Sequence, residues 1–135
     1  MRELRLTQTA LKDFEAIRSY TLETYGQNQL SAYSSLIDQA LEDLRLDPLR
    51  AGSKHRPEVD PKTRSYRISL SVDRAGVDVK NPRHLIFYFQ ERDDALVVTR
   101  ILHEAMDHKR HVSKSKKDFE FEVQNRDGPS RGRSL

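Results

Sequence analysis

The stretch from His84 to Val112 limits most strongly what this chain can fold into. Two apolar runs of strand length, HLIFYFQ from His84 and ALVVTRILH from Ala95, flank the polar break ERDD. Runs rich in Val, Ile, Phe and Tyr that are separated by a short polar loop are typical of a β-hairpin. Because each run is nearly continuous in apolar residues, we expect two adjacent central strands that helices cover on at least one face.

The second run leads directly into a polar, titratable segment, where we expect any chemistry to sit. Its residues are Arg100, His103, Glu104, Asp107, His108, Lys109, Arg110 and His111. The spacing of His103 and His108 does not fit a zinc-protease motif, which needs histidines four apart on one helical face. His108 and His111 would meet on a helix, but no further ligand set accompanies them. We therefore do not predict a metal site.

A short strand and a helix are predicted at the start of the chain. Residues 3–6 alternate polar and apolar, and Thr7 or Thr9 offers a hydroxyl that can cap the following helix. Gly26 ends this helix, because glycine tolerates the left-handed conformation there. The predicted buried face has Ile17 at its margin and consists of Leu11, Phe14, Leu22 and Tyr25.

A second amphipathic helix is predicted from the capping residue Asn28 to Asp47, just before Pro48. Its apolar stripe consists of Leu30, Tyr33, Ile37, Ala40, Leu41 and Leu44. Two such helices joined by a short turn form an antiparallel hairpin, and their apolar faces need a sheet to pack against.

The segment between the helices and the central strands is predicted to be irregular at first. Residues 48–63 read as a loop with a basic cluster of Lys54, His55 and Arg56, which either contacts a target or is simply solvated. Residues 64–71 alternate and predict a strand, and residues 73–82 predict an edge hairpin that turns at Gly76.

The last 23 residues differ in composition from the rest of the chain. Residues 113–135 are rich in Lys, Ser, Arg and Gly and predict a polar, basic, flexible tail, with strand-like alternation only at 118–123. Lys114, Lys116 and Lys117 would bind anionic partners in a salt-dependent way. The remaining residues 1–112 are nearly neutral in net charge, so any attraction to phosphate depends on local patches.

The composition favours one small soluble domain. The chain has 135 residues and no cysteine, which excludes disulfides and cysteine nucleophiles. No apolar run is long enough for a membrane span, and no signal peptide is evident. We therefore expect a cytoplasmic protein of the α+β class, in which the N-terminal strand and the helical hairpin pack on one face of a mainly antiparallel sheet.

These elements and residues resemble the ParE/RelE superfamily of bacterial toxins, the toxin halves of type II toxin–antitoxin systems, often described as plasmid stabilisation proteins. The resemblance covers residues 1–112, the predicted toxin domain, and leaves 113–135 outside it. Its most specific parts are LIFY from Leu85, and RILH, MD and RH from Arg100 onward. Further matches are Leu6, Thr7, Ala10, Asp13, Phe14, Ile17, Tyr20, Pro48, Gly52 and Arg64.

The resemblance implies one of two activities. RelE-like members are ribosome-dependent mRNA endonucleases, and in that case Arg67, Arg100 and His103 are the candidate catalytic residues. ParE-like members inhibit DNA gyrase by binding and have no established catalytic residues. Leu85 stands where the nucleases often carry an arginine, and no tyrosine follows Tyr88. The motifs therefore favour a gyrase inhibitor that a small ParD-like antitoxin neutralises, without a cofactor.

The residues expected to contact the target are Arg100, His103, Glu104, Asp107, Arg110 and His111. Two of them also have a structural interpretation. Arg100 lies on an apolar strand, where its guanidinium would pair with a carboxylate such as Glu104 or Asp107. His103 would be hydrogen-bonded into the turn that follows the strand.

Overall fold

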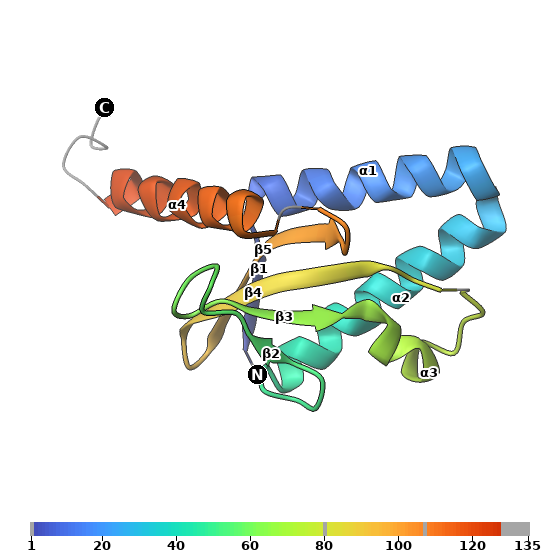
Figure 1. Cartoon of the computed structure of the whole chain (residues 1–135), viewed down its shortest axis with the longest axis horizontal. Coiled ribbons are helices and arrows are strands. Elements are labelled where there is room, and N and C mark those ends of the chain that lie inside the picture. Colours follow the sequence, from blue (N-terminus) through green and yellow to red (C-terminus); the bar gives the residue numbers. More distant parts are fainter. Residues whose placement is uncertain (1, 80, 107, 128–135) are drawn as a thin grey trace.

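The structure is a computed structural model that describes residues 2–79, 81–106 and 108–127 (Figure 1). One sheet has the strand order β1-β5-β4-β3-β2, in which β1 is parallel to β5 and the other neighbours are antiparallel. The strands are β1 (Glu3–Leu6), β2 (Lys54–His55), β3 (Arg64–Arg67), β4 (His84–Arg92) and β5 (Ala95–His103). The helices are α1 (Gln8–Tyr25), α2 (Gln27–Leu46), α3 (Val72–Ala75) and α4 (His108–Asp127), with a 3-10 turn, η1 (Ile68–Ser71). This confirms the predicted α+β class.

The predicted central hairpin is present as β4 and β5. Strand β4 continues to Arg92, so that only Asp93 and Asp94 form the turn instead of four residues. Alternate residues of β4 belong to two different cores: Ile86 and Tyr88 face one side of the sheet, whereas Leu85 and Phe87 face the other. Both faces are covered, which explains why the strand reads as a continuous apolar run.

The larger core lies between the sheet and the helical hairpin. Its fully buried helix residues come mainly from α2, namely Leu36, Ile37, Ala40 and Leu44. The smaller core lies on the opposite face and consists of Val59, Leu85, Phe87, Leu102 and Val112. Since Val112 belongs to α4, that helix covers the second face of the sheet.

The predicted buried face of α1 is wrong for most of its members, although Ile17 is buried and Phe14 packs against the core. The buried residues are Ala10, Ile17 and Thr21. Leu11, Leu22 and Tyr25 are 51%, 44% and 65% exposed, and Phe14 is only partly buried at the margin of the core. The helix has two apolar edges, and the edge with smaller side chains approaches the sheet, a choice that periodicity alone cannot make.

The two hairpin helices begin differently. Thr7 caps α1 as predicted, because its hydroxyl oxygen accepts a hydrogen bond from the Ala10 amide at 3.0 Å. The predicted cap Asn28 is wrong, since α2 begins at Gln27 directly after Gly26, which has φ +92° and makes no side-chain cap. Gly26 therefore ends one helix and begins the next, which keeps the connection short.

The chain leaves the sheet sooner than predicted after β3. The strand ends at Arg67, and η1 and α3 replace both the rest of the strand and the expected edge hairpin. Ser71 explains the departure, because its hydroxyl donates to the buried Asp43 carboxylate on α2 at 2.7 Å and contacts the Tyr66 hydroxyl at 2.9 Å. These bonds hold the segment against α2 instead of in the sheet.

Helix α4 replaces most of the predicted flexible tail, and residues 118–123 are helical rather than strand-like. Its first turns dock through polar contacts. The Ser115 hydroxyl donates to the Thr99 carbonyl at 2.8 Å, and the Lys116 ammonium donates to Asp60 at 2.5 Å. Sequence composition missed the helix because serine and lysine, not an apolar stripe, form much of its buried side. The helix continues past the edge of the sheet (Figure 1), and residues 128–135 lie outside the described part.

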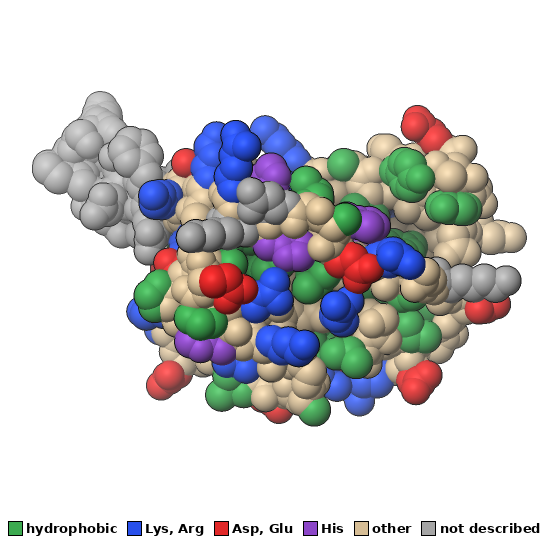
Figure 2. Space-filling model, viewed as in Figure 1, with side chains coloured by type: hydrophobic (Ala, Val, Ile, Leu, Met, Phe, Trp, Pro, Cys, Tyr) green, Lys and Arg blue, Asp and Glu red, His purple; other side chains and the backbone are tan. Residues whose placement is uncertain are grey.

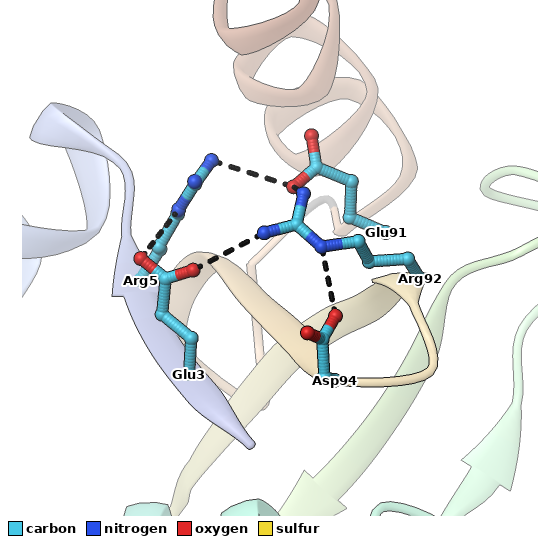
Figure 3. A network of polar contacts seen from close by, with 5 residues as sticks. All are labelled: Glu3, Arg5, Glu91, Arg92 and Asp94. Carbon is cyan, nitrogen blue, oxygen red and sulfur yellow. Dashed lines mark hydrogen bonds and ion pairs between the residues drawn. The ribbon is translucent and has the colours of Figure 1, made fainter.

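A charged network ties β1 to the turn between β4 and β5 (Figure 3). Arg5 contacts Glu3 at 3.1 Å and Glu91 at 3.4 Å, and Arg92 contacts Asp94 at 2.8 Å and Glu3 at 3.4 Å. Exposed pairs such as these contribute at most about 1 kcal/mol each. The network therefore fixes the position of the edge strand more than it stabilises the fold.

Among the described residues no helix combines the length and apolar character that a membrane crossing requires.

Candidate target-binding site

Arg100 is part of a structural ion pair with Asp13 of α1. Its Nε and a terminal nitrogen donate to the two carboxylate oxygens at 2.7 and 2.9 Å, and both side chains are only 14% exposed. The predicted kind of interaction is confirmed, but the partner is not Glu104, and Asp107 lies outside the described residues. A two-bond guanidinium–carboxylate pair at this burial fixes the helix relative to the strand.

Asp13 also completes the edge of the sheet. Strand β1 ends at Leu6, opposite Val98, and beyond this point no strand of the described residues pairs with β5 on that side. The Asp13 carboxylate accepts a hydrogen bond from the backbone amide of Ile101 at 3.0 Å. It satisfies the donor that a further paired strand would otherwise satisfy. The backbone of β5 is therefore satisfied as it approaches the polar segment.

His103 lies at the end of β5, directly opposite His84 of β4, and the two rings meet edge to face at 5.6 Å. The His103 Nδ1 accepts the backbone amide of Ala105 at 3.1 Å. The predicted hydrogen bond into the turn is thus confirmed. His84 in turn lies 2.6 Å from the Tyr33 hydroxyl of α2, measured to Nδ1.

Burial shifts the pKa values of His84 and Tyr33. It lowers the pKa of His84 to about 4, with a further contribution from the nearby His103, and it raises the pKa of Tyr33 to about 12. At neutral pH both side chains are uncharged, and a hydrogen bond joins the Tyr33 hydroxyl to the neutral His84 ring. His84 and Tyr33 were not among the predicted site residues, because a four-residue loop at 91–94 would have placed His84 opposite Ile101 instead of His103.

The neutral His84 predicts a pH-dependent stability. The unfolded chain binds a proton at His84 near pH 6.5, whereas the folded chain does so only near pH 4, so the free energy of unfolding falls as the pH drops through this window. The loss attributable to His84 is at most about 3 kcal/mol. Urea unfolding between pH 7 and 4.5 should show a steeper loss for the natural chain than for His84→Gln. Parallel pH profiles for the two proteins would contradict this account.

Glu104 lies between two arginines on the surface. Its carboxylate accepts hydrogen bonds from the guanidinium groups of Arg67 on β3 at 2.8 Å and of Arg83 at 3.1 Å. Both arginine side chains are 52% exposed. The hydrogen bond from Arg67 is the main reason that the pKa of Glu104 is lowered. Two guanidinium groups share one carboxylate here, which leaves a net positive, accessible cluster. Arg83 was not among the predicted site residues.

The three candidate catalytic residues of a nuclease have separate partners. Arg67 pairs with Glu104, Arg100 pairs with Asp13, and His103 bonds into its own turn. Within the described part of the chain, no hydrogen bond joins any two of the three. Catalysis of phosphoester cleavage needs cations and a proton-transfer group around one reacting centre. These contacts fix the three side chains individually.

The other predicted site residues that the structure describes belong to α4 and to the basic loop cluster. On α4, Arg110 is exposed and His111 is partly buried. The three residues of the basic loop cluster have different surroundings. The Arg56 guanidinium lies 5.5 Å from the centre of the Phe87 ring and 3.3 Å from Nδ1 of His108. Lys54 and His55 are exposed on β2. Residues 2–79, 81–106 and 108–127 contain no group of three His, Cys, Asp or Glu side chains that could hold a metal ion.

Comparison with known proteins gives the family. Residues 4–108 match the sequence model of the family described as the ParE toxin of type II toxin–antitoxin systems, parDE. A solved structure described as the chromosomal ParDE TA system from P. aeruginosa has a TM-score of 0.56 and 16% sequence identity, and the alignment covers 76% of this chain and 96% of that chain. This likeness shows the fold, and the comparison with curated proteins gave no match. Because the family model spans most of the sequence, the chain belongs to the ParE toxin family of type II toxin–antitoxin systems.

Proposed function

We propose that this toxin arrests growth by binding a housekeeping machine, with DNA gyrase as its target, and that a small ParD-like antitoxin neutralises it. The observation that carries the proposal is the pairing of Arg67, Arg100 and His103, each of which is held by a different partner. A binding inhibitor needs an exposed, chemically varied surface and no reacting centre. Membership of the ParE family supports the same choice.

The proposed contact surface lies at the polar end of β5. It combines His103 with the Arg67, Glu104 and Arg83 cluster, and Arg110 and His111 of α4 adjoin it in sequence. Arg100 has a different role in this proposal, because its guanidinium is committed to Asp13. It positions the end of β5, and the residues beyond it contact the target.

The alternative function is a RelE-like mRNA endonuclease on the ribosome, and pulse labelling separates the two. Labelled thymidine and methionine are added to bacteria within minutes of inducing the chain. Gyrase poisoning predicts that DNA synthesis falls first, and that co-expression of the antitoxin encoded beside the toxin restores it. An earlier fall in protein synthesis would overturn the proposal and make Arg67, Arg100 and His103 the residues to substitute.

The exposed stripe of α1 is the proposed antitoxin surface. Leu11, Leu22 and Tyr25 lie on one side of the helix, and the rings of Tyr20 and Tyr25 pack edge to face at 6.3 Å. Large exposed apolar side chains in a row are typical of protein interaction sites. An amphipathic antitoxin helix laid along α1 would bury them.

Substitution of this stripe should weaken antitoxin binding without unfolding the toxin. For Leu22→Ser with Tyr25→Ser we expect at least a tenfold rise in the antitoxin Kd, because both side chains supply apolar contact area. Their exposure predicts a change in unfolding free energy of no more than about 0.5 kcal/mol. Calorimetric titration measures the Kd, and Glu23→Ser, an exposed change on the same helix, is the control. An unchanged Kd for the double variant would place the antitoxin elsewhere.

A further inference from the structure

Arg83 is an exposed arginine whose orientation is fixed by several hydrogen bonds. Its backbone carbonyl accepts a hydrogen bond from the Glu104 amide at 2.9 Å, and its guanidinium donates to the Glu104 carboxylate at 3.1 Å. With the amide oxygen of Asn81 turned toward Arg83, Nε and a terminal nitrogen of the guanidinium donate to that oxygen at 3.1 and 3.0 Å. The Arg83 side chain is nevertheless 52% exposed. Its rotamer is therefore restricted before any partner binds, which lowers the entropic cost of binding.

Asn81 has an unusual backbone conformation. Among the described residues it is the only one other than glycine with a positive φ, at +53°. Asparagine tolerates this left-handed conformation better than most residues, but the following Pro82 favours an extended conformation at position 81. Backbone strain of this kind is found where a fold holds a binding group in a fixed position. The segment from Asn81 to Arg83 is therefore shaped to present the guanidinium group.

The cluster of Arg67, Arg83 and Glu104 carries an excess of positive charge. Both guanidinium groups pair with the same carboxylate, at 2.8 Å and 3.1 Å. The charged network at the edge strand β1 (Figure 3) is the opposite case, because two arginines pair there with three carboxylates. A further anion is therefore attracted to the first cluster and repelled by the second.

The two guanidinium groups of the cluster also keep unused donors. A guanidinium has five N–H donors. Arg83 uses three of them, for Asn81 and Glu104, and Arg67 uses one, for Glu104. The other N–H groups have no acceptor among the residues that the structure describes. Figure 2 shows Lys, Arg and His side chains near one another on the face that carries β3 and the end of β5, where this cluster lies.

We propose that Arg67 and Arg83 together bind one carboxylate, the side chain of an Asp or Glu on the target protein. This inference rests on the proposed function, since it names the chemical group that the contact surface recognises. The unused N–H groups supply charge-assisted hydrogen bonds to the two carboxylate oxygens, and their planar arrangement is one that lysine cannot offer. Asn81 is a positioning residue, because it acts through Arg83. An arginine that is held in place and exposed is typical of the few residues that carry most of the binding energy.

A nucleic acid fits this cluster less well than a protein does. Nucleic acids present a row of phosphates, and binding them needs several cations along that row. The cluster has a small excess of charge, and residues 1–112 are nearly neutral. Met106 lies in the turn after Glu104, where its amide donates to the His103 carbonyl at 3.1 Å, and it is 41% exposed. Since arginine and methionine are both enriched in protein interfaces, the surroundings favour a protein carboxylate.

The first test needs no gyrase. A short capped oligoglutamate peptide is titrated into the isotope-labelled full chain, and NMR follows the Nε–H signals of the arginine side chains. The signals of Arg67 and Arg83 should shift and saturate, whereas those of Arg5 and Arg92, whose network is net negative, should stay in place. Oligothymidylate of the same net charge should give a smaller response at the cluster. No saturable shift at Arg67 and Arg83, or an equal or larger response to oligothymidylate, would overturn the proposal.

Three variants separate the roles of the residues in the same titration. Arg83→Lys keeps the charge but loses part of the hydrogen bonding, and it should weaken peptide binding by about tenfold. Asn81→Gly keeps the backbone φ without strain, so the urea midpoint should not fall, but a less ordered Arg83 should weaken binding by about threefold. Arg92→Lys, at an arginine that is 54% exposed, is the matched control and should bind like the natural chain.

Equal losses for Arg83→Lys and Arg92→Lys would contradict the carboxylate site, and unchanged binding for Asn81→Gly would contradict the positioning role. The second test repeats the series with purified gyrase, where the concentration of toxin for half inhibition should rise in the same order. A chain that binds the peptide as expected but leaves gyrase active would overturn the choice of gyrase and keep the carboxylate site. Inhibition of gyrase that Arg83→Lys does not weaken would overturn the site and keep the target, so the two failures are seen separately.

Discussion

Replacing Asp43 with alanine is expected to lower the free energy of unfolding by about 3 kcal/mol or more. The Asp43 side chain is fully buried in α2, and three side chains donate to its carboxylate. These bonds come from Gln39 at 2.9 Å, Ser71 at 2.7 Å and Arg74 at 2.7 Å. Alanine would leave the buried Ser71 hydroxyl without this acceptor and release η1 and α3 from α2.

Urea unfolding at neutral pH measures this effect. Asp73→Ala removes an exposed carboxylate from α3 and is the control, with an expected change within about 0.5 kcal/mol. Burial alone would raise the pKa of Asp43, but the hydrogen bonds from Ser71, Gln39 and Arg74 outweigh it and lower the pKa. The stabilisation is therefore present at neutral pH and is lost only in acid, as the carboxylate is protonated. A loss below about 1 kcal/mol for Asp43→Ala would contradict the described network.

The pair of Arg100 and Asp13 is the second large effect. Each single change to alanine should destabilise the fold by about 2–4 kcal/mol, because the remaining partner is left largely buried and unpaired. Removing both should cost less than the sum of the single losses, with a coupling energy of about 2 kcal/mol. The reason is that the second substitution has no ion pair left to break.

A double-mutant cycle in urea measures the coupling, and the Arg67 and Glu104 pair gives the control cycle. That pair is also close, at 2.8 Å, but its side chains are 52% and 30% exposed, so its coupling should stay below about 1 kcal/mol. If Arg100 instead served only as a target contact, Arg100→Ala would leave stability unchanged and weaken target binding alone. That result would return Arg100 to the contact surface.

Much of the fold could be predicted because local signals agreed with the tertiary structure. The two apolar runs around Asp93 and Asp94 formed the expected hairpin, and Thr7 capped the expected helix. The buried face of α1 could not be predicted in the same way. Leu11 and Leu22 are as apolar as core residues, and only the sheet decides that Ala10 and Ile17 face inward.

For the candidate site, the type of interaction that Arg100 makes could be predicted, but its partner could not. A guanidinium on an apolar strand needs a carboxylate, and this rule gave the correct interaction for Arg100. Its partner Asp13 is 87 residues away in sequence, and no local pattern connects the two. Helix α4 was missed for a related reason, because Ser115 and Lys116 acquire their buried partners only through the tertiary fold.

Inhibition of purified DNA gyrase by the full chain tests the central claim most directly. Gyrase supercoils relaxed plasmid, and added toxin should reduce the supercoiled product in proportion to its concentration, whereas a preformed complex with the antitoxin should have no effect. Arg67→Ala, Arg83→Ala and His103→Ala should each weaken inhibition in graded steps, as expected for contacts spread over a surface. Unchanged supercoiling at micromolar toxin, together with cleavage of ribosome-bound mRNA that any one of these changes abolishes, would contradict the account.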